Sequence, residues 1–365
     1  PAPRPMTYLI DLDECVLRTG HLRPYLHTRE GRRHIAQHPD LVKTEENPGM
    51  IAFVNQLRGA TIITNSPRDY ATALMNKHGI NAGLIGAAGK PFATGLPDEY
   101  VIVGDACTDI LQGRRDGQTA IGMSEGYNTE TQLGQSGACA IAHDADELED
   151  LIIAHQRGRL ATCAAMPQSE LTPVATDVDI HALGAYHPFN QGECDGLSAQ
   201  IMAFKDAKNY TIERINSGAT RDYFHGGRVR TGENMLTVIN SLLGTAVTQL
   251  DEMEPGLLIA MPNSLPDYCY RTDINSVFTR NLGKRTKHDA ETERSIRRVS
   301  PVSSAHTGGT RAAHSETLSV EVPETEHIIL FDDVATSGTS LRTAAGLLRA
   351  AGYEGKISAL TLGRT

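Results

Sequence analysis

The chain has 365 residues, of which 40% are hydrophobic and 21% are charged, and its formal net charge is −10. This composition indicates a globular protein with room for two cores and excludes a disordered or fibrous chain. No apolar run approaches the roughly 20 residues that span a bilayer, and the first ten residues do not read as a signal peptide. We therefore expect a cytoplasmic protein without a membrane partner, and the acidic charge argues against nucleic-acid binding through a broad basic face.

The first part of the chain alternates short apolar strands with helices. Strands are predicted at 7–10, 60–64, 100–105 and 119–123. Helices are predicted at 50–57, 68–79 and 144–160, and the second of these has Pro67 at its start and Gly79 at its end. Such alternation predicts a parallel sheet that helices cover on both faces.

Residues 161–179 contain three threonines and two prolines and show no periodicity, which indicates a linker. Helices are then predicted at 232–247 and 338–352, and strands at 256–264, 327–333 and 356–365. The predicted fold class is α/β, with two domains that each hold a mostly parallel sheet with flanking helices. We expect the first domain at 1–160 and the second at 180–365.

The charged and sulfur-containing residues add two expectations. The six cysteines, at positions 15, 107, 139, 163, 194 and 269, show no metal-ligand spacing, so we expect reduced thiols and neither a disulfide framework nor a zinc site. Five arginines and one glutamate lie between Arg18 and Arg33, and eight Lys or Arg and three acids lie between Arg280 and Arg311. These segments are either solvated surface or places where small anions gather.

Polar residues follow the strands of the first domain in four short motifs, "DLDEC", "IITNS", "GKP" and "GDACTD". The carboxyl ends of parallel strands share one edge of the sheet, which is where ligands of such folds bind. Acids at one strand end are common, but four motifs in this order are hard to obtain by chance. The candidate residues are Asp11, Asp13, Thr64, Asn65, Lys90, Asp105 and Asp109.

These motifs resemble those of the haloacid dehalogenase-like hydrolase superfamily over roughly residues 7–125. The resemblance implies that Asp11 is a nucleophile and Asp13 a general acid and then base. It implies that Asp11 and Asp105 hold Mg²⁺, with the backbone carbonyl of Asp13 as a further ligand and Asp109 in support. Thr64 and Lys90 would bind the transferring phosphoryl group, and Asn65, next to Thr64 in the "IITNS" motif, is a further candidate.

Asp13 favours a phosphatase, since the dehalogenases of this superfamily lack the second acid. The gaps between the motifs leave room for only a small basic cap insert, which contains the Arg18–Arg33 segment. The alternative is a degenerate fold that is kept as a scaffold.

The second domain contains "IILFDDVATSGTSL", in which a strand leads through two acids into small residues and a helix. A helix that begins here would direct its positive end at an anion, and a glycine lets the backbone approach closely. The stretch resembles the phosphoribosyl-pyrophosphate (PRPP) loop of type I phosphoribosyltransferases. This implies that Asp332 and Asp333 bind the ribose hydroxyls, and that the 5′-phosphate is wrapped by Ala335, Thr336, Ser337, Gly338 and Thr339. The alternative is a Ser/Thr-capped helix.

Upstream, residues 261–264 stand where that family has its pyrophosphate loop, which makes Asn263 and Ser264 candidates. The basic segments that follow resemble the ComF-type branch, and they add Arg271, Asn275 and Arg311. This resemblance covers about residues 180–365.

Together the two resemblances imply a bifunctional Mg²⁺-dependent enzyme, a phosphomonoester hydrolase joined to a PRPP-dependent phosphoribosyltransferase. It would make or process a nucleotide- or nucleoside-like metabolite from PRPP, a base or other acceptor, and a phosphorylated small molecule. The alternative is a PRPP-binding regulatory domain that controls a phosphatase. The acceptor, the order of the reactions and the oligomeric state are left open.

Overall fold

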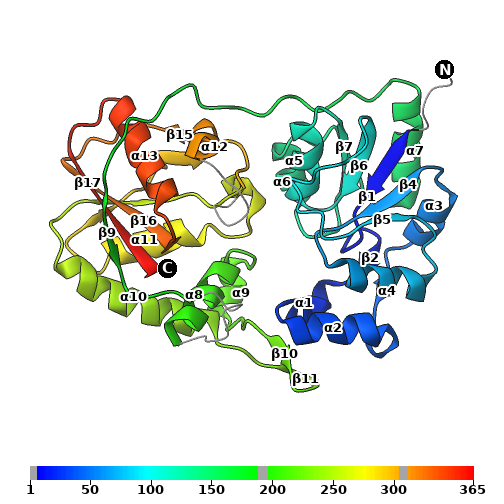
Figure 1. The fold of residues 1–365 in the computed structure, drawn as a ribbon, viewed down its shortest axis with the longest axis horizontal. Helices are drawn as coiled ribbons and strands as arrows, with labels where there is room; N and C mark the ends of the chain where they lie inside the picture. The colour runs from blue at the N-terminus through cyan, green and yellow to red at the C-terminus, as the bar shows by residue number, and fades with distance from the viewer. Residues whose placement is uncertain (1–5, 188–195, 304–310) are drawn as a thin grey trace. The chain divides into compact units, whose positions relative to one another are not determined.

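The computed structural model describes residues 6–187, 196–303 and 311–365, and the side chains of 311–313 are not described (Figure 1). Its contacts divide the chain into two units. Unit 1 holds the described residues up to Met166 together with Asp222–Thr231, and unit 2 holds those of Pro167–Arg221 and Gly232–Thr365. Within the described residues, no helix combines the length and apolarity that a membrane crossing needs.

Unit 1 is built on a six-stranded sheet in the order β5-β4-β1-β6-β7-β8, and every neighbouring pair is parallel. This confirms the predicted parallel α/β sheet. The strands are β1 (Thr7–Ile10), β4 (Ala60–Ile63), β5 (Gly83–Ile85), β6 (Tyr100–Gly104), β7 (Thr119–Met123) and β8 (Ala140–Ala142).

Helices cover both faces of this sheet. Successive strand residues point to opposite sides, so each apolar strand contributes side chains to a core on either face. Tyr8 and Ile10 belong to one core, and Leu9 between them belongs to the other. The first core also contains residues of α3 (Met50–Gln56), α4 (Arg68–His78) and α7 (Ala145–Gln156), and the second contains residues of α5 (Cys107–Arg115) and α6 (Glu130–Gln135).

A small insert follows β1 and contains most of the first basic segment. Its elements are β2 (Leu17–Arg18), η1 (Gly20–Leu22), α1 (Arg23–Leu26), α2 (Arg29–Gln37), η2 (Pro39–Leu41) and β3 (Glu45–Glu46). Because β2 and β3 pair with each other, the insert returns the chain to α3 close to where it left. The insert is small, and its role as a cap stays a prediction.

A hairpin from the later part of the chain completes unit 1. It consists of β10 (Tyr223–His225) and β11 (Arg228–Arg230), which pair with each other. Phe224 is 2% exposed and stacks against Tyr25 of α1 and His34 of α2, at 4.7 Å between ring centroids in both cases. Thr28 Oγ1 also donates to the Phe224 carbonyl (2.9 Å). The expected second domain, 180–365, therefore includes a hairpin that packs with unit 1.

Unit 2 has a five-stranded sheet in the order β13-β12-β16-β17-β9, again parallel throughout. Its strands are β9 (Asp179–Ala182), β12 (Leu257–Ala260), β13 (Asp289–Ala290), β16 (His327–Ala335) and β17 (Lys356–Arg364). A separate antiparallel pair is formed by β14 (Ile296–Arg298) and β15 (Leu318–Val320).

The two faces of this sheet carry different helices. Ile329 and Phe331 pack with α8 (Gly196–Ala207), α10 (Met235–Asp251) and α11 (Ile274–Gly283). Ile328 and Leu330 pack with α13 (Thr339–Ala350) and with β14 and β15. Shorter elements are α9 (Ile212–Asn216), η4 (Asp267–Cys269) and α12 (Arg311–Glu316).

Both sheets reverse their strand order at one point. In unit 1 the chain runs from β1 to β4 and β5 on one side, and from β6 to β7 and β8 on the other. In unit 2 it runs from β12 to β13 on one side, and from β16 to β17 on the other. Open α/β sheets bind ligands outside the carboxyl ends of the two central strands at such a reversal. The predicted motifs follow these strands: β1 and β6 in unit 1, and β12 and β16 in unit 2.

Candidate active sites

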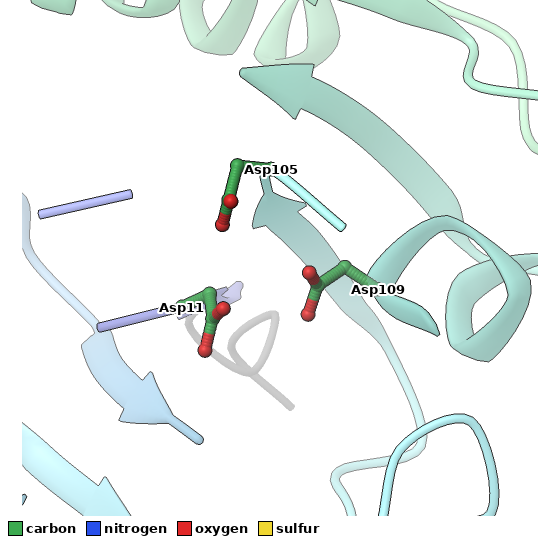
Figure 2. Close-up of side chains that lie close together, drawn as sticks. All are labelled: Asp11, Asp105 and Asp109. Carbon is green, nitrogen blue, oxygen red and sulfur yellow. The ribbon is translucent and has the colours of Figure 1, made fainter. Parts of the chain in front are cut away.

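Three buried carboxylates meet at the reversal point of unit 1 (Figure 2). Asp11 directly follows β1, Asp105 directly follows β6, and Asp109 lies in the first turn of α5. One oxygen of each lies within 4.8 Å of the other two, and the residues are 7%, 1% and 0% exposed. The sequence predicted all three residues, and the reversal of the sheet brings them together.

Two glycines leave the space that these carboxylates occupy. A Cβ at Gly104 would lie 2.2 Å from Asp109 Cγ, and a Cβ at Gly126 would lie 2.1 Å from Asp105 Cβ. Neither separation is possible between non-bonded atoms. The acids therefore reach their positions only because these two neighbours lack side chains. Gly104 ends the "VIVG" strand, whereas nothing in the sequence marked Gly126.

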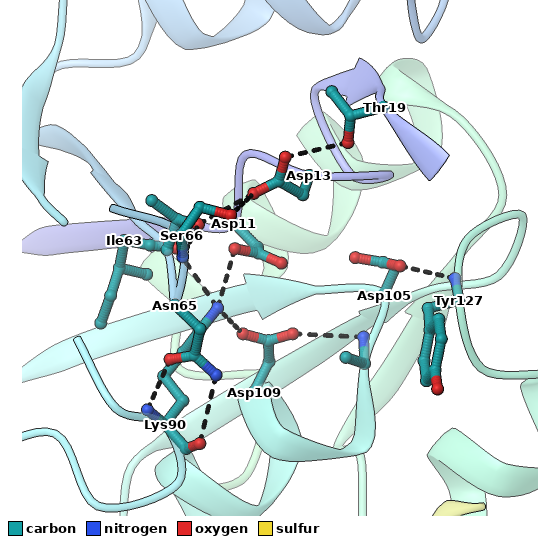
Figure 3. Close-up of polar contacts among 12 residues, drawn as sticks. Asp11, Asp13, Thr19, Ile63, Asn65, Ser66, Lys90, Asp105, Asp109 and Tyr127 are labelled. Atoms are coloured by element: carbon teal, nitrogen blue, oxygen red, sulfur yellow. Dashed lines mark hydrogen bonds and ion pairs between the residues drawn. The ribbon is translucent and has the colours of Figure 1, made fainter. Parts of the chain in front are cut away.

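Lys90 places its ammonium group among the carboxylates (Figure 3). Its Nζ lies 2.8 Å from Asp11 Oδ1, and it also donates to Asp109 Oδ1 and to the Ile63 carbonyl. Asn65 fixes the Lys90 backbone from both sides, because its Oδ1 accepts from Lys90 N (2.7 Å) and its Nδ2 donates to Lys90 O (3.2 Å). Asn65 therefore fixes the backbone of Lys90. The motif that contains Asn65 did not predict this role.

Burial governs the protonation of this cluster. It raises the pKa of Asp11 to about 8, against the pull of Lys90 and with the support of Asp109. Burial likewise raises the pKa of Asp105 well above its usual range, and Asp11 adds to this. Burial alone would lower the pKa of Lys90, but Asp109 and Asp11 raise it above its ordinary value. The cluster is therefore short of positive charge.

The residues present fit a divalent cation. When all three acids are ionised, they and the ammonium group of Lys90 leave two negative charges, which one Mg²⁺ ion would balance. Asp105 Oδ2 accepts from Tyr127 N (2.6 Å), but the buried Oδ1 of Asp105 has no hydrogen-bond partner. Both oxygens of Asp109 are engaged, one by Lys90 and one by Ala106 N. Asp11 and Asp105 are therefore the carboxylates that would hold the ion, through the oxygen ligands that Mg²⁺ prefers.

Asp13 is held apart from this cluster by hydroxyl groups. Its Oδ1 accepts from Thr19 Oγ1 (2.9 Å) and Tyr70 OH (2.8 Å), and its Oδ2 accepts from Thr64 Oγ1 (3.0 Å) and Ser66 Oγ (2.8 Å). To act on a substrate, the carboxylate would have to exchange some of these hydrogen bonds. The proposed roles of Asp13 in acid–base chemistry and of Thr64 in phosphoryl binding stay predictions.

Arg23 brings one charge of the first basic segment near the site. Its guanidinium lies 5.1 Å from the ring centroid of Tyr127, whose backbone N–H binds Asp105. The high arginine content of 18–33 pointed to this segment, but only the fold distinguishes Arg23 from its neighbours. Arg23 is therefore a candidate for contact with a second anionic group of the substrate.

In unit 2, Asp332 and Asp333 are part of β16, which continues to Ala335. Asp332 Oδ1 accepts from Asp333 N (2.9 Å), and Asp333 Oδ2 lies 3.5 Å from Lys205 Nζ of α8. Burial raises the pKa of Asp332 to about 7, and Asp333 adds to the shift. The sequence predicted the two acids but not Lys205 as a partner.

The turn after β16 is shorter than predicted. Ala335 is 3% exposed and its carbonyl accepts from Thr365 N (3.2 Å), so it pairs within the sheet instead of lying in a loop. The turn itself is Thr336 to Gly338, and α13 begins at Thr339 with Gly338 as its N-cap in the left-handed region (φ 70°). Ser337 Oγ lies 2.7 Å from Thr339 Oγ1. The segment is thus a helix N-terminus lined with hydroxyl groups, as the sequence predicted.

The residues after β12 follow the strand that lies beside β16 in the sheet. The Asn263 carbonyl accepts from Arg298 Nε (3.0 Å), while the buried Nδ2 of Asn263 has no hydrogen-bond partner. Ser264 is exposed, and its carbonyl accepts from Val302 N. Asn275 is buried and donates to the Met261 carbonyl (3.0 Å), so it supports the end of β12 from within the core.

Arg298 is a buried cation of unit 2 that the sequence motifs did not identify. It is 5% exposed and donates to the Asn263 carbonyl and to Thr317 Oγ1 (2.6 Å). Burial lowers its pKa to about 10. Only its place in the basic segment 280–311 indicated a role for Arg298.

The side chain of the predicted Arg271 is exposed, and its backbone N–H donates to the Lys208 carbonyl. Arg311 is the first residue of α12, and its side chain lies outside the described part of the structure.

Known proteins resemble this chain only distantly. A scan against protein-family models and a search of curated proteins find no match. A hydrolase of known structure from Pseudomonas syringae is 18% identical, with 41% of this chain and 98% of its own covered and a TM-score of 0.35. A HAD family hydrolase from Deinococcus radiodurans, with bound phosphate and sodium, is 17% identical over 42% of this chain and 96% of its own, with a TM-score of 0.33.

A haloacid dehalogenase-like family hydrolase from Streptococcus pneumoniae is 15% identical, covers 40% of this chain and 98% of its own, and has a TM-score of 0.32. These identities and TM-scores are too low to transfer an activity. The function of the chain therefore has to be argued from the geometry of its own residues.

Proposed function

We propose that unit 1 is a Mg²⁺-dependent phosphomonoester hydrolase. The observation that carries this proposal is the group of Asp11, Asp105 and Asp109 around Lys90, which is two positive charges short of neutrality at the sheet reversal. Such a site draws in one divalent cation and, through it, an anionic group. When bound, the cation offsets the repulsion between the Asp11 carboxylate and a phosphate.

In the proposed reaction, an Asp11 oxygen attacks phosphorus, and the alcohol of the substrate departs with a proton from Asp13. Water, deprotonated by Asp13, then attacks the aspartyl phosphate and releases phosphate. Lys90 both orients Asp11 and supplies a positive charge to the phosphoryl oxygens. The four hydroxyl groups on Asp13 keep that side chain in place until substrate binding frees it.

The test uses purified protein, Mg²⁺ and p-nitrophenyl phosphate. We expect Mg²⁺-dependent hydrolysis that chelation abolishes, and we expect Asp11→Asn to remove it by roughly a thousandfold or more. Asp146→Asn, an exposed aspartate of α7, is the matched control and should keep full activity. If Asp11→Asn keeps more than about a tenth of the rate, the covalent route is wrong.

For unit 2, we propose PRPP-dependent phosphoribosyl transfer to an acceptor that is still to be identified. The support is the pair of segments that follow the neighbouring parallel strands β12 and β16 at the reversal of the sheet. The hydroxyl-lined start of α13 offers N–H groups and the positive end of a helix to a phosphate. Asp332 and Asp333 offer acceptors to ribose hydroxyls, and Arg298 lies beside the opposite loop for the pyrophosphate.

Calorimetry with PRPP and Mg²⁺ tests this second half. Each hydrogen bond to a charged group contributes roughly 1.5–3 kcal/mol. Asp332→Ala combined with Asp333→Ala should therefore weaken PRPP binding on the order of a hundredfold. Pyrophosphate release with candidate bases then separates a transferase from a PRPP-binding regulator. Unchanged PRPP affinity would mean that the loop is only a capped helix N-terminus. Loss of phosphatase activity in the same variant would favour a PRPP-binding regulatory domain over a transferase.

A further inference from the structure

Two cysteines that lie far apart in the sequence meet in unit 1. Cys139 directly precedes β8, and Cys163 follows α7, 24 positions later. Their Sγ atoms are 3.1 Å apart. A disulfide has an S–S bond of about 2.05 Å, so closing the gap needs a movement of roughly 1 Å.

The two sulfurs differ in their hydrogen bonds, in the direction of their pKa shifts and in their exposure. Cys139 Sγ accepts from the Ala120 backbone N–H (3.4 Å) and lies in hydrogen-bond contact with the Cys163 sulfur, and these contacts lower the pKa of Cys139 to about 6. The same contact with Cys139 raises the pKa of Cys163. Cys139 is the more exposed of the two, since Cys163 is 8% exposed. This gives a reachable thiolate next to a thiol that can resolve it.

A metal site does not explain the pair. Within the described residues, the one group of three or more His, Cys, Asp or Glu side chains with metal-binding spacing is Asp11, Asp105 and Asp109. A zinc site would need further ligands beside the two sulfurs. The geometry therefore favours sulfur–sulfur chemistry.

We propose that Cys139 and Cys163 are a redox-active pair that a small disulfide of the glutathione class oxidises to an intramolecular disulfide. The Cys139 thiolate attacks one sulfur of the small disulfide, forms a mixed disulfide and releases one small thiolate. Cys163 then loses its proton and attacks Cys139 Sγ, which expels the second small thiolate. The protein loses two electrons and two protons, and one small disulfide becomes two small thiols.

The disulfide would lock the strap formed by residues 161–165. Hydrogen bonds already hold this strap to unit 1: Cys163 N donates to the Gln118 carbonyl (3.0 Å), and Arg114 donates to the carbonyls of Ala164 (2.8 Å) and Ala165 (3.1 Å). The new bond would close a loop that contains β8 and α7. Cross-linking a loop of this length constrains the unfolded chain and stabilises the fold.

The experiment equilibrates the reduced full chain with oxidised and reduced glutathione and counts free thiols. We expect the count to fall from six to four, peptide mapping to find Cys139 joined to Cys163, and the Tm of unit 1 to rise by roughly 5 °C. Cys139→Ser and Cys163→Ser should abolish all three effects. Cys269→Ser, a buried cysteine of unit 2, is the matched control and should keep them.

Trypsin gives a second readout on the wild-type chain. Arg157 and Arg159 are exposed and lie between the two cysteines. Cleavage there should split the reduced protein, whereas the oxidised protein should separate into two pieces only after reduction. At pH 7, iodoacetamide should modify Cys139 first. A disulfide between other cysteines, or a mixed disulfide on Cys139 that persists at equilibrium, would overturn the proposal.

Discussion

Lys90 and Asp11 form an ion pair inside unit 1, with 2.8 Å between Nζ and Oδ1 and side-chain exposures of 2% and 10%. A pair this deeply buried behaves differently from one at the surface. Its charges have lost their water, so removal of one partner leaves the other without compensation. The pair therefore links the stability of unit 1 to the charge of the acidic cluster.

Lys90→Met should destabilise unit 1 on the order of 3–5 kcal/mol in the absence of metal, because the buried acids lose the ammonium group that stabilises their negative charge and must take up protons instead. Mg²⁺ should raise the Tm of this variant more than that of the wild type. Scanning calorimetry with and without Mg²⁺ measures both effects. Lys43→Met is the control, since Lys43 pairs with Glu45 at the surface (2.6 Å) and such pairs contribute about 0–1 kcal/mol. Equal melting of the two variants would contradict the prediction.

Gly126→Ala should weaken Mg²⁺ binding by about ten- to a hundredfold, the usual effect of displacing the support of a ligand. The added Cβ would lie 2.1 Å from Asp105 Cβ, so the carboxylate or its turn must move. The readout is the Mg²⁺ concentration for half-maximal hydrolysis. Gly134→Ala in α6 meets no atom within 4 Å and should behave as the wild type. Normal Mg²⁺ dependence in Gly126→Ala would mean that Asp105 is not a metal ligand.

Phe224→Ala should destabilise unit 1 by about 3–5 kcal/mol, although Phe224 lies in the second half of the sequence. Its ring is buried between Tyr25 and His34, and truncation leaves a cavity there. Val229→Ala in the same hairpin is the control, because Val229 is 42% exposed. Calorimetry should show a lower Tm for unit 1 in the first variant and little change in the second. No change in either would mean that the hairpin does not support the insert.

Asp332→Asn should stabilise unit 2 at pH 8 but not at pH 4. Because burial raises the pKa of Asp332 to about 7, the folded state holds its proton more tightly than the unfolded state. Wild-type stability therefore falls as pH rises from about 4 to about 7, and the amide removes this loss. We expect a Tm gain of several degrees at pH 8. Asp251→Asn, at the exposed end of α10, should show no such gain. A gain that is independent of pH would contradict the ionisation argument.

Arg298→Lys should weaken pyrophosphate binding by at least about tenfold, because lysine cannot reproduce the planar fork of a guanidinium that also donates to Asn263 and Thr317. Arg297→Lys is the matched control, since Arg297 is the next residue in the same strand but is exposed. Calorimetry with Mg²⁺ and pyrophosphate measures both. Equal affinities in the two variants would leave Arg298 with a structural role only.

The sequence alone predicted the α/β class and most of the central strands and helices, because apolar runs of strand length and helix-ending residues such as Gly79 act locally. It also predicted Asp11, Asp105 and Asp109 as one site, since residues after parallel strands share a sheet edge. The structure brings these three carboxylates together at the reversal of the sheet.

Tertiary structure decided what depends on contacts between distant segments. The spacing of the cysteines gave no sign of a metal site or a disulfide framework, yet the fold places Cys139 beside Cys163. The hairpin that contains Phe224 follows two helices of unit 2 in the sequence, α8 and α9, but the ring of Phe224 packs against Tyr25 of α1 and His34 of α2. Arg298 is one of eight basic residues in its segment, and the fold buries it beside Asn263 and Thr317. Local pattern carries no information about such partners, because burial and pairing are set by the whole chain.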